Sequence, residues 1–526
     1  MVLSCVPLLS TRIRRRRAEM NAAHPANPGS SPSRIRYPIV LLCLVFSGQL
    51  SCGSMWIASD SVGRVDQSVT EPSLDQPNIV YILVDNWGWA DVSVQGGKIP
   101  TPRIDELAAA GIRLTNFNVE NQCTPTRSAI HTGRLPIRSG TQRVSGPGDA
   151  DGLAVWEYTL AELLSDEGYA TALFGKWHLG SQPGRMPNDQ GYDSWWGINE
   201  GSNAAGYTAT PQFDPAVAAI PHVWVGEKGA VSRPIRKYDI AARERFDRES
   251  VDRAAEFIRA RAKSDRPFFA FVGFTHLHPP FVVHPDFNGR SGKGIYADSQ
   301  LEIDFNVGRL LDAIQQVGVA ENTLVILTGD NGPGSFPVGE GPDWFVEGSA
   351  GPWRGGLSTG YEGGLRTPAI AKWPGHIPAA RVSDEIFSAL DWLPTLAHLI
   401  GGSTRIPTDR PIDGVDQSEF LLGRQLHSNR ESTVTFVGEE IFAVKWRNMK
   451  MHFFTAEHTH SPIQSHTFPK IFDLEVDPGE LRELWEAEGF VHAWVTTPIS
   501  KIIADLKSSM QSYPNIQPGH EFPGYE

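Results

Sequence analysis

One cysteine and one arginine stand close together in a stretch that predicts the start of a helix, Cys123 to Arg127. Pro125 suits the first helical position, Thr124 suits the cap before it, and Gly133 suits the C-terminal end. Cys123 would then lie beside unpaired backbone N–H groups at the positive end of a helix dipole, where anions bind. Arg127, one turn further, could donate to two oxygens of a tetrahedral anion. The alternative is a small buried cysteine in a loop, which is the commoner role of this residue.

Polar side chains also follow four apolar, β-branched segments, at 78–84, 170–174, 267–274 and 324–328, which predict buried strands. The carboxyl ends of parallel strands meet at one edge of a sheet, and sites form there in α/β proteins. Each polar residue alone is more commonly a turn or cap residue, but the four strand ends and the cysteine motif together indicate one site. These residues are Asp85, Asn86, Lys176, His178, His276, His278, Asp330 and Asn331.

The first and fourth of these strand ends predict a metal site. Each carries an Asp–Asn pair, and such side chains offer only oxygen ligands, which suit Ca²⁺ or Mg²⁺ and do not suit zinc. The predicted ligands are Asp85, Asn86, Asp330 and Asn331. The net charge of −13 argues against nucleic acid as the main partner, although an anionic substrate can bind where the site is locally positive.

The elements that position these residues alternate between strands and helices. Helices are expected at 101–110, 159–168, 243–262 and 301–317. This alternation predicts an α/β fold, with a large, mostly parallel sheet and helices on both faces.

After about Gly401 the pattern changes to short strands and one helix near 499–510, which predicts a smaller C-terminal α+β subdomain with an antiparallel sheet. The spacing of four histidines in this part fits no metal motif, so we expect them in a solvated loop, with a substrate-contacting loop as the alternative. They are His452, His458, His460 and His466.

The N-terminus predicts export. A basic run at 12–17 precedes an apolar run at 39–46, which is too short to span a bilayer and is typical of a secretory signal. We therefore expect a leader at 1–52, a linker at 53–76, a catalytic domain at 77–400 and a C-terminal subdomain at 401–526. The mature chain would be periplasmic or extracellular, and Cys52 is a weak candidate for lipid attachment. Cys123 would then have no partner for a disulfide bond, which favours a chemical role.

Several motifs together resemble the type I sulfatases of the alkaline phosphatase superfamily, across roughly the whole mature chain. The segments that carry the resemblance are Cys-x-Pro-x-Arg at 123–127, Gly-Lys-Trp-His-Leu-Gly at 175–180, Asp-Asn-Gly at 330–332, Tyr-Glu-Gly-Gly-Leu-Arg-Thr-Pro at 361–368 and the turn at 471–480. Thr126 is a mild departure, because the family usually has Ser or Ala there.

The resemblance implies a sulfatase that hydrolyses a sulfate ester. Together with the expected export, it suggests a sulfated polysaccharide as the substrate. It implies that a formylglycine-generating or anaerobic sulfatase-maturating enzyme oxidises Cys123 to formylglycine, whose hydrate is the nucleophile. It also implies that Ca²⁺, rather than Mg²⁺, binds the four predicted ligands together with residue 123.

The resemblance also implies roles for the remaining residues. Arg127 and His178 would hold the hydrate, Lys176 would bind a sulfate oxygen, and Asp330 could accept the proton of the nucleophile. His278 matches the residue that protonates the leaving alcohol, because Pro279-Pro280 follow it, and His276 is the second candidate.

Two further positions depart from the family. Asn86 replaces an Asp, which removes one negative charge from the metal site. Leu357 stands where the family has a second sulfate-binding Lys, four residues before Tyr361, and nearby Arg354 is a candidate replacement. These departures leave two alternatives open: a phosphodiesterase or phosphonate hydrolase of the same superfamily, and a non-catalytic protein that binds sulfated glycans.

Overall fold

The computed structural model describes residues 76–144, 152–337, 344–346 and 348–525. The expected leader, Cys52 and all of the expected linker except Gln76 lie outside the described residues. Within the described part of the chain, no helix is both long enough and apolar enough to cross a membrane.

The main sheet has ten strands in the described residues, and its centre is parallel. Five neighbouring strands run in one direction. The connections that lead to β4, β8 and β9 contain α-helices, as crossovers between parallel strands usually do. In sheet order they are β9 (Thr323–Gly329), β1 (Asn78–Val84), β8 (Phe268–Gly273), β4 (Ala170–Lys176) and β5 (Ser194–Ile198). The four strands predicted from the sequence are thus adjacent, and their carboxyl ends meet at one edge.

The margins of the sheet contain antiparallel pairs, and only the outermost pair, β13 with β2, is parallel there. The prediction of a mostly parallel sheet is therefore confirmed for its centre. Strand β12 pairs antiparallel with β9, and β6 pairs antiparallel with β5. The short connection from β6 to β7 permits a hairpin, which needs no crossover helix. The marginal strands are β12 (Ala369–Lys372), β2 (Ile112–Leu114), β13 (Arg381–Ser383), β6 (His222–Glu227) and β7 (Arg233–Lys237).

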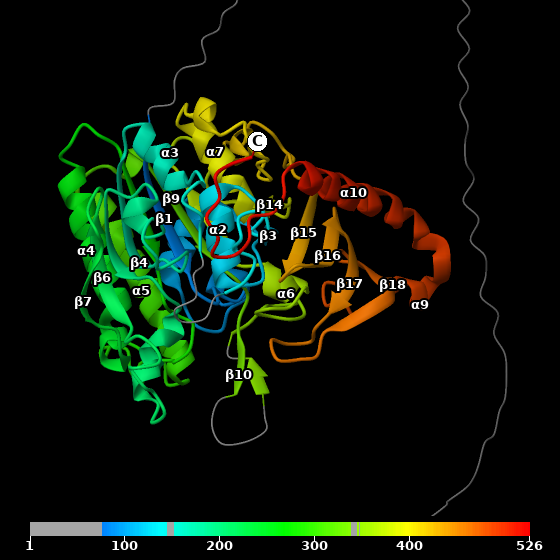
Figure 1. Cartoon of the computed structure of the whole chain (residues 1–526), viewed down its shortest axis with the longest axis horizontal. Helices are drawn as coiled ribbons and strands as arrows, with labels where there is room; N and C mark the ends of the chain where they lie inside the picture. The colour runs from blue at the N-terminus through cyan, green and yellow to red at the C-terminus, as the bar shows by residue number, and fades with distance from the viewer. Residues whose placement is uncertain (1–75, 145–151, 338–343, 347, 526) are drawn as a thin grey trace, which may run out of the picture. The chain divides into compact units, whose positions relative to one another are not determined.

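Helices cover both faces of the sheet, as Figure 1 shows. Alternate residues of β1 point to opposite faces, so Ile79 and Val80 belong to two separate apolar cores. On the first face lie α2 (Cys123–Thr132), α3 (Leu160–Asp166) and α7 (Trp392–Leu399). On the second lie α1 (Pro102–Ala109), α4 (Ile240–Arg261) and α5 (Ile295–Gln316).

Helix α2 begins two residues earlier than the sequence predicts. Gln122, with extended backbone, is the cap, and Cys123 is the first helical residue. The Thr124 hydroxyl does not cap the helix, because it donates to the backbone carbonyl of His178 at 3.1 Å. Gly133 ends the helix in the left-handed conformation, at φ 63°, as predicted.

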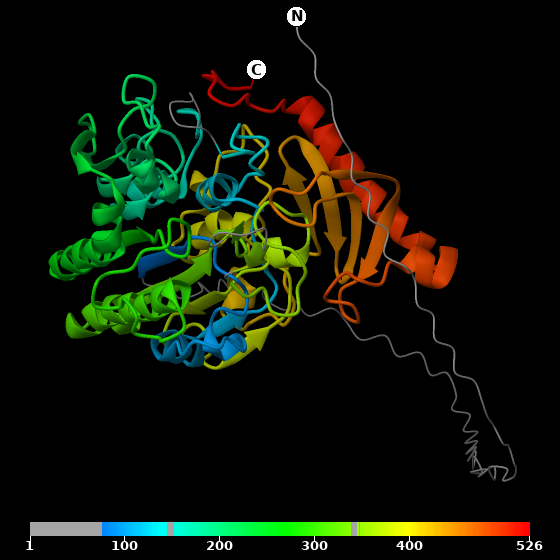
Figure 2. The same ribbon diagram turned by 90° about the horizontal axis from the view of Figure 1, so that it is seen from below.

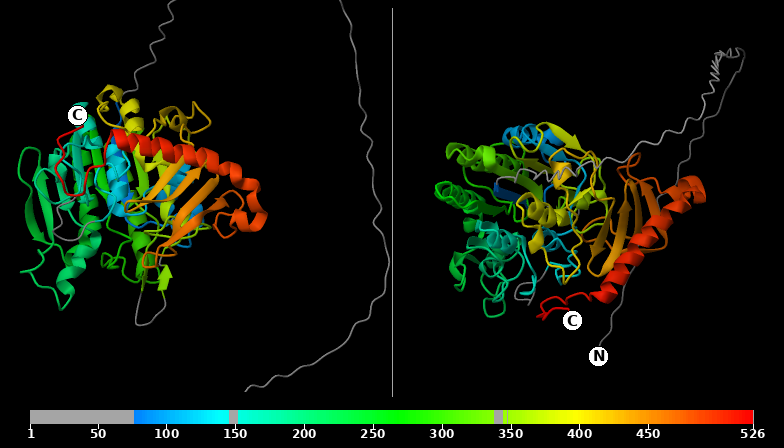
Figure 3. Two further views of the ribbon diagram at one scale, coloured as in Figure 1. Left: turned by 45° about the vertical axis from the view of Figure 1, so that its right-hand side comes forward. Right: turned by 90° about the horizontal axis from the view of Figure 1, so that it is seen from above.

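The C-terminal subdomain is a four-stranded antiparallel sheet with a long helix across it, as predicted (Figures 2 and 3). Helix α10 (Thr496–Ser512) contributes Ile499 to a small apolar core with Val444 and Met451 of the sheet. The strands are β15 (Ser432–Val437), β16 (Glu440–Trp446), β17 (Met449–Thr455) and β18 (Gln464–Asp473).

The prediction that all four C-terminal histidines lie in a solvated loop is wrong for His452. This residue is buried on β17, and its Nε2 lies 2.5 Å from Glu480 Oε2. His458 and His460 do lie in the connection between β17 and β18, whereas His466 lies within β18 itself.

The remaining elements are short. They are β3 (Phe117–Asn118), β10 (Ser335–Pro337), β11 (Trp344–Val346), α6 (Glu362–Leu365), β14 (Phe387–Ser388), α8 (Ser418–Leu421) and α9 (Leu484–Glu488), with 3-10 turns such as η3 (Ser202–Ala209) between them.

Candidate active site

The Asp85 carboxylate, directly after β1, gathers side chains from three other elements. Its Oδ1 accepts from the Cys123 thiol at 3.3 Å. Its Oδ2 accepts from Lys176 Nζ at 2.8 Å and from the Ser202 hydroxyl at 2.6 Å. The sheet order places β1 and β4 on either side of β8, so their carboxyl ends deliver Asp85 and Lys176 to the same edge.

Asp330, directly after β9, forms the second half of the site with Arg127. Arg127 Nε and Nη2 both donate to Asp330 Oδ2, at 3.1 and 2.9 Å, and both side chains are buried. Arg127 Nη1 also donates to the backbone carbonyl of Lys176 at 2.7 Å. Through Arg127, helix α2 is therefore tied to the ends of both β9 and β4.

The two asparagines of the predicted metal site lie beside these carboxylates. Asn86 donates its backbone N–H to Asp330 Oδ1 at 3.1 Å, and Asn331 Nδ2 donates to Asn86 Oδ1 at 2.7 Å. Asn86 has φ 56°, a conformation that asparagine tolerates better than most residues. Asn331 Oδ1 and Asn86 Nδ2 are buried and have no hydrogen-bond partner.

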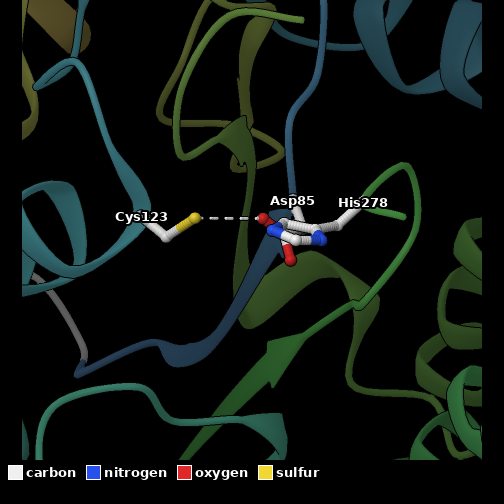
Figure 4. A group of neighbouring side chains, drawn as sticks. All are labelled: Asp85, Cys123 and His278. Carbon is white, nitrogen blue, oxygen red and sulfur yellow. Dashed lines mark hydrogen bonds between the residues drawn. The ribbon is translucent and has the colours of Figure 1, made fainter. Parts of the chain in front are cut away.

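His178 and His278 are both partly exposed, in contrast to the buried Asp85 and Lys176. One ligand atom from each of Asp85, Cys123 and His278 lies within 4.8 Å of the others (Figure 4). Burial, followed by the charges of Lys176 and Arg127, holds the pKa of His178 well below its usual range. Burial lowers the pKa of His278 to about 4, and its Nδ1 lies 2.7 Å from the Pro279 carbonyl oxygen.

His276, the second candidate for leaving-group acid, is engaged elsewhere. Its Nε2 lies 3.1 Å from Glu302 Oε2, and its Nδ1 lies 3.6 Å from Asp247 Oδ2. Burial opposes its charge, but these two carboxylates outweigh burial and raise the pKa of His276. The structure therefore brings His278, and not His276, to the Asp85–Cys123 pair.

Burial and neighbouring charges shift the pKa values of Asp85, Asp330 and Cys123. Burial opposes ionisation of Asp85, but Lys176, His278 and Arg127 together lower its pKa. Burial and the negative charge of Asp85 raise the pKa of Asp330 to about 6. The same two effects raise the pKa of the Cys123 thiol, so the unmodified cysteine is protonated near neutral pH and is a poor nucleophile.

Ser202 is a site residue that the sequence analysis missed. It follows β5, whose sequence Ser-Trp-Trp-Gly-Ile has too little β-branched character to predict a strand. The strand-end argument, applied to β5, would have identified the polar residues at 199–203.

The structure does not bring the Arg354 guanidinium to the Asp85–Cys123 pair. Arg354 Nη2 lies 2.5 Å from Glu457 Oε2, and Nη1 donates to the Glu480 carbonyl at 2.9 Å. Its guanidinium also lies 4.3 Å from the centre of the Tyr361 ring. These contacts hold Arg354 against the C-terminal subdomain.

The residues present fit a divalent cation. Asp85 and Asp330 are buried carboxylates close enough for one to raise the pKa of the other, and Asn331 Oδ1 is a buried oxygen without a donor. Such a set of hard oxygens matches Ca²⁺ or Mg²⁺. Asn86 Oδ1 accepts one hydrogen bond from Asn331 Nδ2 and keeps a second lone pair that could ligate the cation.

A family model, several relatives and several solved structures that match this chain are sulfatases. Residues 77–402 match the sulfatase family model, and residues 428–521 match the C-terminal region of aryl-sulfatase. Human arylsulfatase A is 37% identical over 431 residues, covering 77% of this chain and 82% of the relative. N-acetylgalactosamine-6-sulfatase of Canis lupus familiaris is 33% identical over 438 residues, covering 77% and 81%. The crystal structure of the PsFucS1 sulfatase from Pseudoalteromonas sp. has a TM-score of 0.76 and 30% identity, covering 85% of this chain and 93% of that one.

The fold, the site and these matches define a sulfuric ester hydrolase. The chain belongs to the sulfatase family, as a type I sulfatase of the alkaline phosphatase superfamily.

Proposed function

We propose that this sulfatase cleaves its ester with a formylglycine made from Cys123. The observation that carries the proposal is the position of Cys123 Sγ, in the first turn of α2 and 3.3 Å from Asp85 Oδ1. A hydrated aldehyde at this position would supply a nucleophilic oxygen, which the protonated thiol does not.

The surrounding side chains have distinct tasks in this proposal. Arg127 and His178 hold the modified residue, and Lys176 binds a sulfate oxygen through its ammonium group. His278 donates a proton to the leaving alcohol, because it is partly exposed and lies beside the Asp85–Cys123 pair. Asp330 accepts a proton from the nucleophile.

We propose Ca²⁺ as the cation, with Mg²⁺ as the alternative. The ligands would be Asp85, Asn86, Asp330 and Asn331, together with the modified residue 123. When bound, the cation supplies positive charge that stabilises the sulfate oxygens.

The proposed maturation partner is a formylglycine-generating or anaerobic sulfatase-maturating enzyme. Cys123 is only 3% exposed in the folded chain. A modifying enzyme therefore has access to this side chain before folding is complete, which agrees with the proposed export of the chain to the periplasm or the extracellular space.

The proposed substrate is a sulfated carbohydrate. A relative with 33% identity is named for the 6-sulfate of N-acetylgalactosamine, which supports a sugar ester. The test is to measure release of sulfate and of phosphate from matched esters of one alcohol. We expect cleavage of the sulfate ester to be the faster reaction, and a preference for the phosphate ester would contradict the proposal.

A further inference from the structure

A cavity of about 280 Å³ lies between the residues around α2 and the C-terminal subdomain. Segments that precede and follow α2 form one side of it, and strand β15 and helix α10 form the other. The volume is near the lower end of the range for small-molecule sites, and the cavity is partly open to solvent. None of the described residues that line it belongs to the candidate active site, so this cavity is a separate feature of the molecule.

The carboxyl of Glu120 lines this cavity without a partner. The side chain is 7% exposed, and no described residue forms a hydrogen bond or an ion pair with its carboxyl oxygens, which are accessible from the cavity. Its backbone is held in place, because its N–H donates to Thr126 Oγ1 at 3.0 Å. A buried carboxylate without a counter-ion is costly, and a cation supplied by a ligand would recover part of this cost.

The other charged side chains that line the cavity are already in ion pairs. Arg138 Nε lies 2.9 Å from Asp413 Oδ2, Arg430 Nη2 lies 2.5 Å from Asp391 Oδ1, and Lys501 Nζ lies 2.6 Å from Asp505 Oδ2. An anionic ligand would therefore find both guanidiniums paired and would be repelled by Glu120. A divalent cation would find one carboxyl without a cationic partner, whereas such ions need several oxygen ligands. The cavity thus favours an organic cation with a single positive charge.

A second group without a partner lies on the other side of the cavity. Thr435 of β15 is 5% exposed, and no described residue forms a hydrogen bond with its hydroxyl group, which is accessible from the cavity. A ligand that reaches from Glu120 to Thr435 would meet a carboxylate at one end and a hydroxyl at the other. An ammonium group suits the first contact, and a hydroxyl group, which both donates and accepts, suits the second.

We propose that this cavity is a binding site for a small ammonium compound that carries hydroxyl groups, of the class of the amino sugars. The ammonium group pairs with Glu120, and a hydroxyl group of the ligand bonds with Thr435. The apolar side chains of the cavity pack against the carbon atoms of the ligand; they include Val119, Leu135, Leu390 and Leu506. The proposal does not depend on the proposed sulfate ester hydrolysis, because Glu120 and Thr435 have no task in that reaction.

The test compares two probes by isothermal titration calorimetry. Galactosamine carries an ammonium group at neutral pH, and galactose has nearly the same shape with a hydroxyl group in its place. The titration uses the full enzyme in an amine-free buffer, with Ca²⁺ present so that the proposed cation site is filled. We expect one molecule of galactosamine to bind per chain, roughly 10-fold or more tightly than galactose.

Three variants locate the site. Glu120→Gln keeps the shape of the side chain and removes its charge, and it should weaken binding of galactosamine roughly 10- to 150-fold. Thr435→Val removes only the hydroxyl group and should weaken binding roughly 2- to 10-fold. Glu227→Gln removes an exposed carboxylate at the end of β6 and should leave binding unchanged. Thermal melting of each variant checks that it is folded.

Each possible outcome bears on the proposal. Galactose that binds as tightly as galactosamine would overturn it, because the cavity would then not recognise the charge. No binding of galactosamine at millimolar concentration, or unchanged binding by Glu120→Gln, would overturn it as well. If Glu120→Gln does not fold, the comparison of the two sugars on the wild type and the effect of Thr435→Val still decide. None of these readouts needs turnover, so a failure of the proposed function would leave the test intact.

Discussion

Lys450 of β17 and Glu362 of α6 form a buried ion pair, with Nζ 2.8 Å from Oε1. Lys445 and Arg366 bind the other oxygen of Glu362, at 2.8 and 2.5 Å. Burial opposes the charge of Glu362, but the three cations hold the pKa of its carboxyl well below the usual range. One carboxylate therefore connects the C-terminal sheet to the segment that precedes β12, within the catalytic domain.

Removal of this carboxylate should destabilise the whole protein. Glu362→Gln leaves buried cations without their counter-ion, and we expect the free energy of unfolding to fall by about 3–5 kcal/mol. Urea unfolding measures the change, with Glu440→Gln on the exposed part of β16 as a matched control. A loss no greater than that of the control would show that the cluster does not stabilise the fold.

The buried carboxyl of Glu120 should make the folded state less stable as the pH rises. A carboxylate in an ion pair, whose pKa is lowered, has the opposite effect. Burial, then repulsion from Asp413, raises the pKa of Glu120 to about 8, and Arg430 offsets only part of this effect. The folded state thus binds a proton that the unfolded state has lost between about pH 4.5 and pH 8. The contribution of Glu120 to stability is therefore full below this window and declines as the pH rises through it.

Glu120→Gln removes this titration while keeping the shape of the side chain. Relative to the wild type, the variant should gain stability as the pH rises from 5 to about 9, by about 1.4 kcal/mol at most for each unit of pKa shift. Urea unfolding at several pH values measures the difference. A difference between the two proteins that does not vary with pH would contradict the assignment.

The proposed cation should be visible in both activity and stability. Chelation should abolish turnover, and Ca²⁺ should restore it better than Mg²⁺. Added Ca²⁺ should also raise the Tm of the wild type, because a ligand that binds only the folded state stabilises it.

Asp330→Ala should lose both responses, since its carboxylate is a predicted ligand. Asp505→Ala, in an exposed pair with Lys501 on α10, is the control and should keep them. Active protein that contains neither Ca²⁺ nor Mg²⁺ by elemental analysis, and that chelation does not affect, would rule out the site.

The position of Leu357 should limit the binding of sulfate. Leu357→Lys would add a charged donor to the segment before Tyr361, and kcat/KM on a sulfate ester should rise roughly 10- to 150-fold if the ammonium acts in the transition state. Steady-state kinetics measures the change, and no increase would mean that Lys at this position does not reach the sulfate.

Substitution of Arg354 tests whether its guanidinium takes the place of the sulfate-binding Lys that the family has at the position of Leu357. Its contacts with Glu457 and Glu480 lead us to expect that Arg354→Ala lowers the Tm more than it lowers kcat/KM. A strong loss of kcat/KM, with partial rescue by Leu357→Lys in the double variant, would show instead that Arg354 binds the sulfate.

The centre of the fold, and the meeting of the predicted strand ends at one edge, follow local rules that can be read from the sequence. A continuous apolar strand such as β1 is recognisable from its composition, and Asp85 at its end lies at the carboxyl edge wherever the strand stands in a parallel sheet. The helix predicted from residue 159 begins with a capping box of Thr159 and Glu162, which is a local feature because both partners lie within one turn.

The features that the sequence did not predict depend on contacts between distant segments. Thr124 was a reasonable cap until its hydroxyl met the carbonyl of His178, which lies 54 residues away. Arg354 is held by Glu457, 103 residues further along the chain. No local pattern encodes such pairs, and composition alone gives no sign that His452 is buried beside Glu480.

The central claim is that the nucleophile is made from Cys123, and mass spectrometry of the active enzyme tests it most directly. The peptide that contains residue 123 should have the lower mass of an aldehyde in place of the CH₂SH group. Cys123→Ala should give a folded protein without turnover. Active enzyme whose peptide carries only unmodified cysteine would contradict the account.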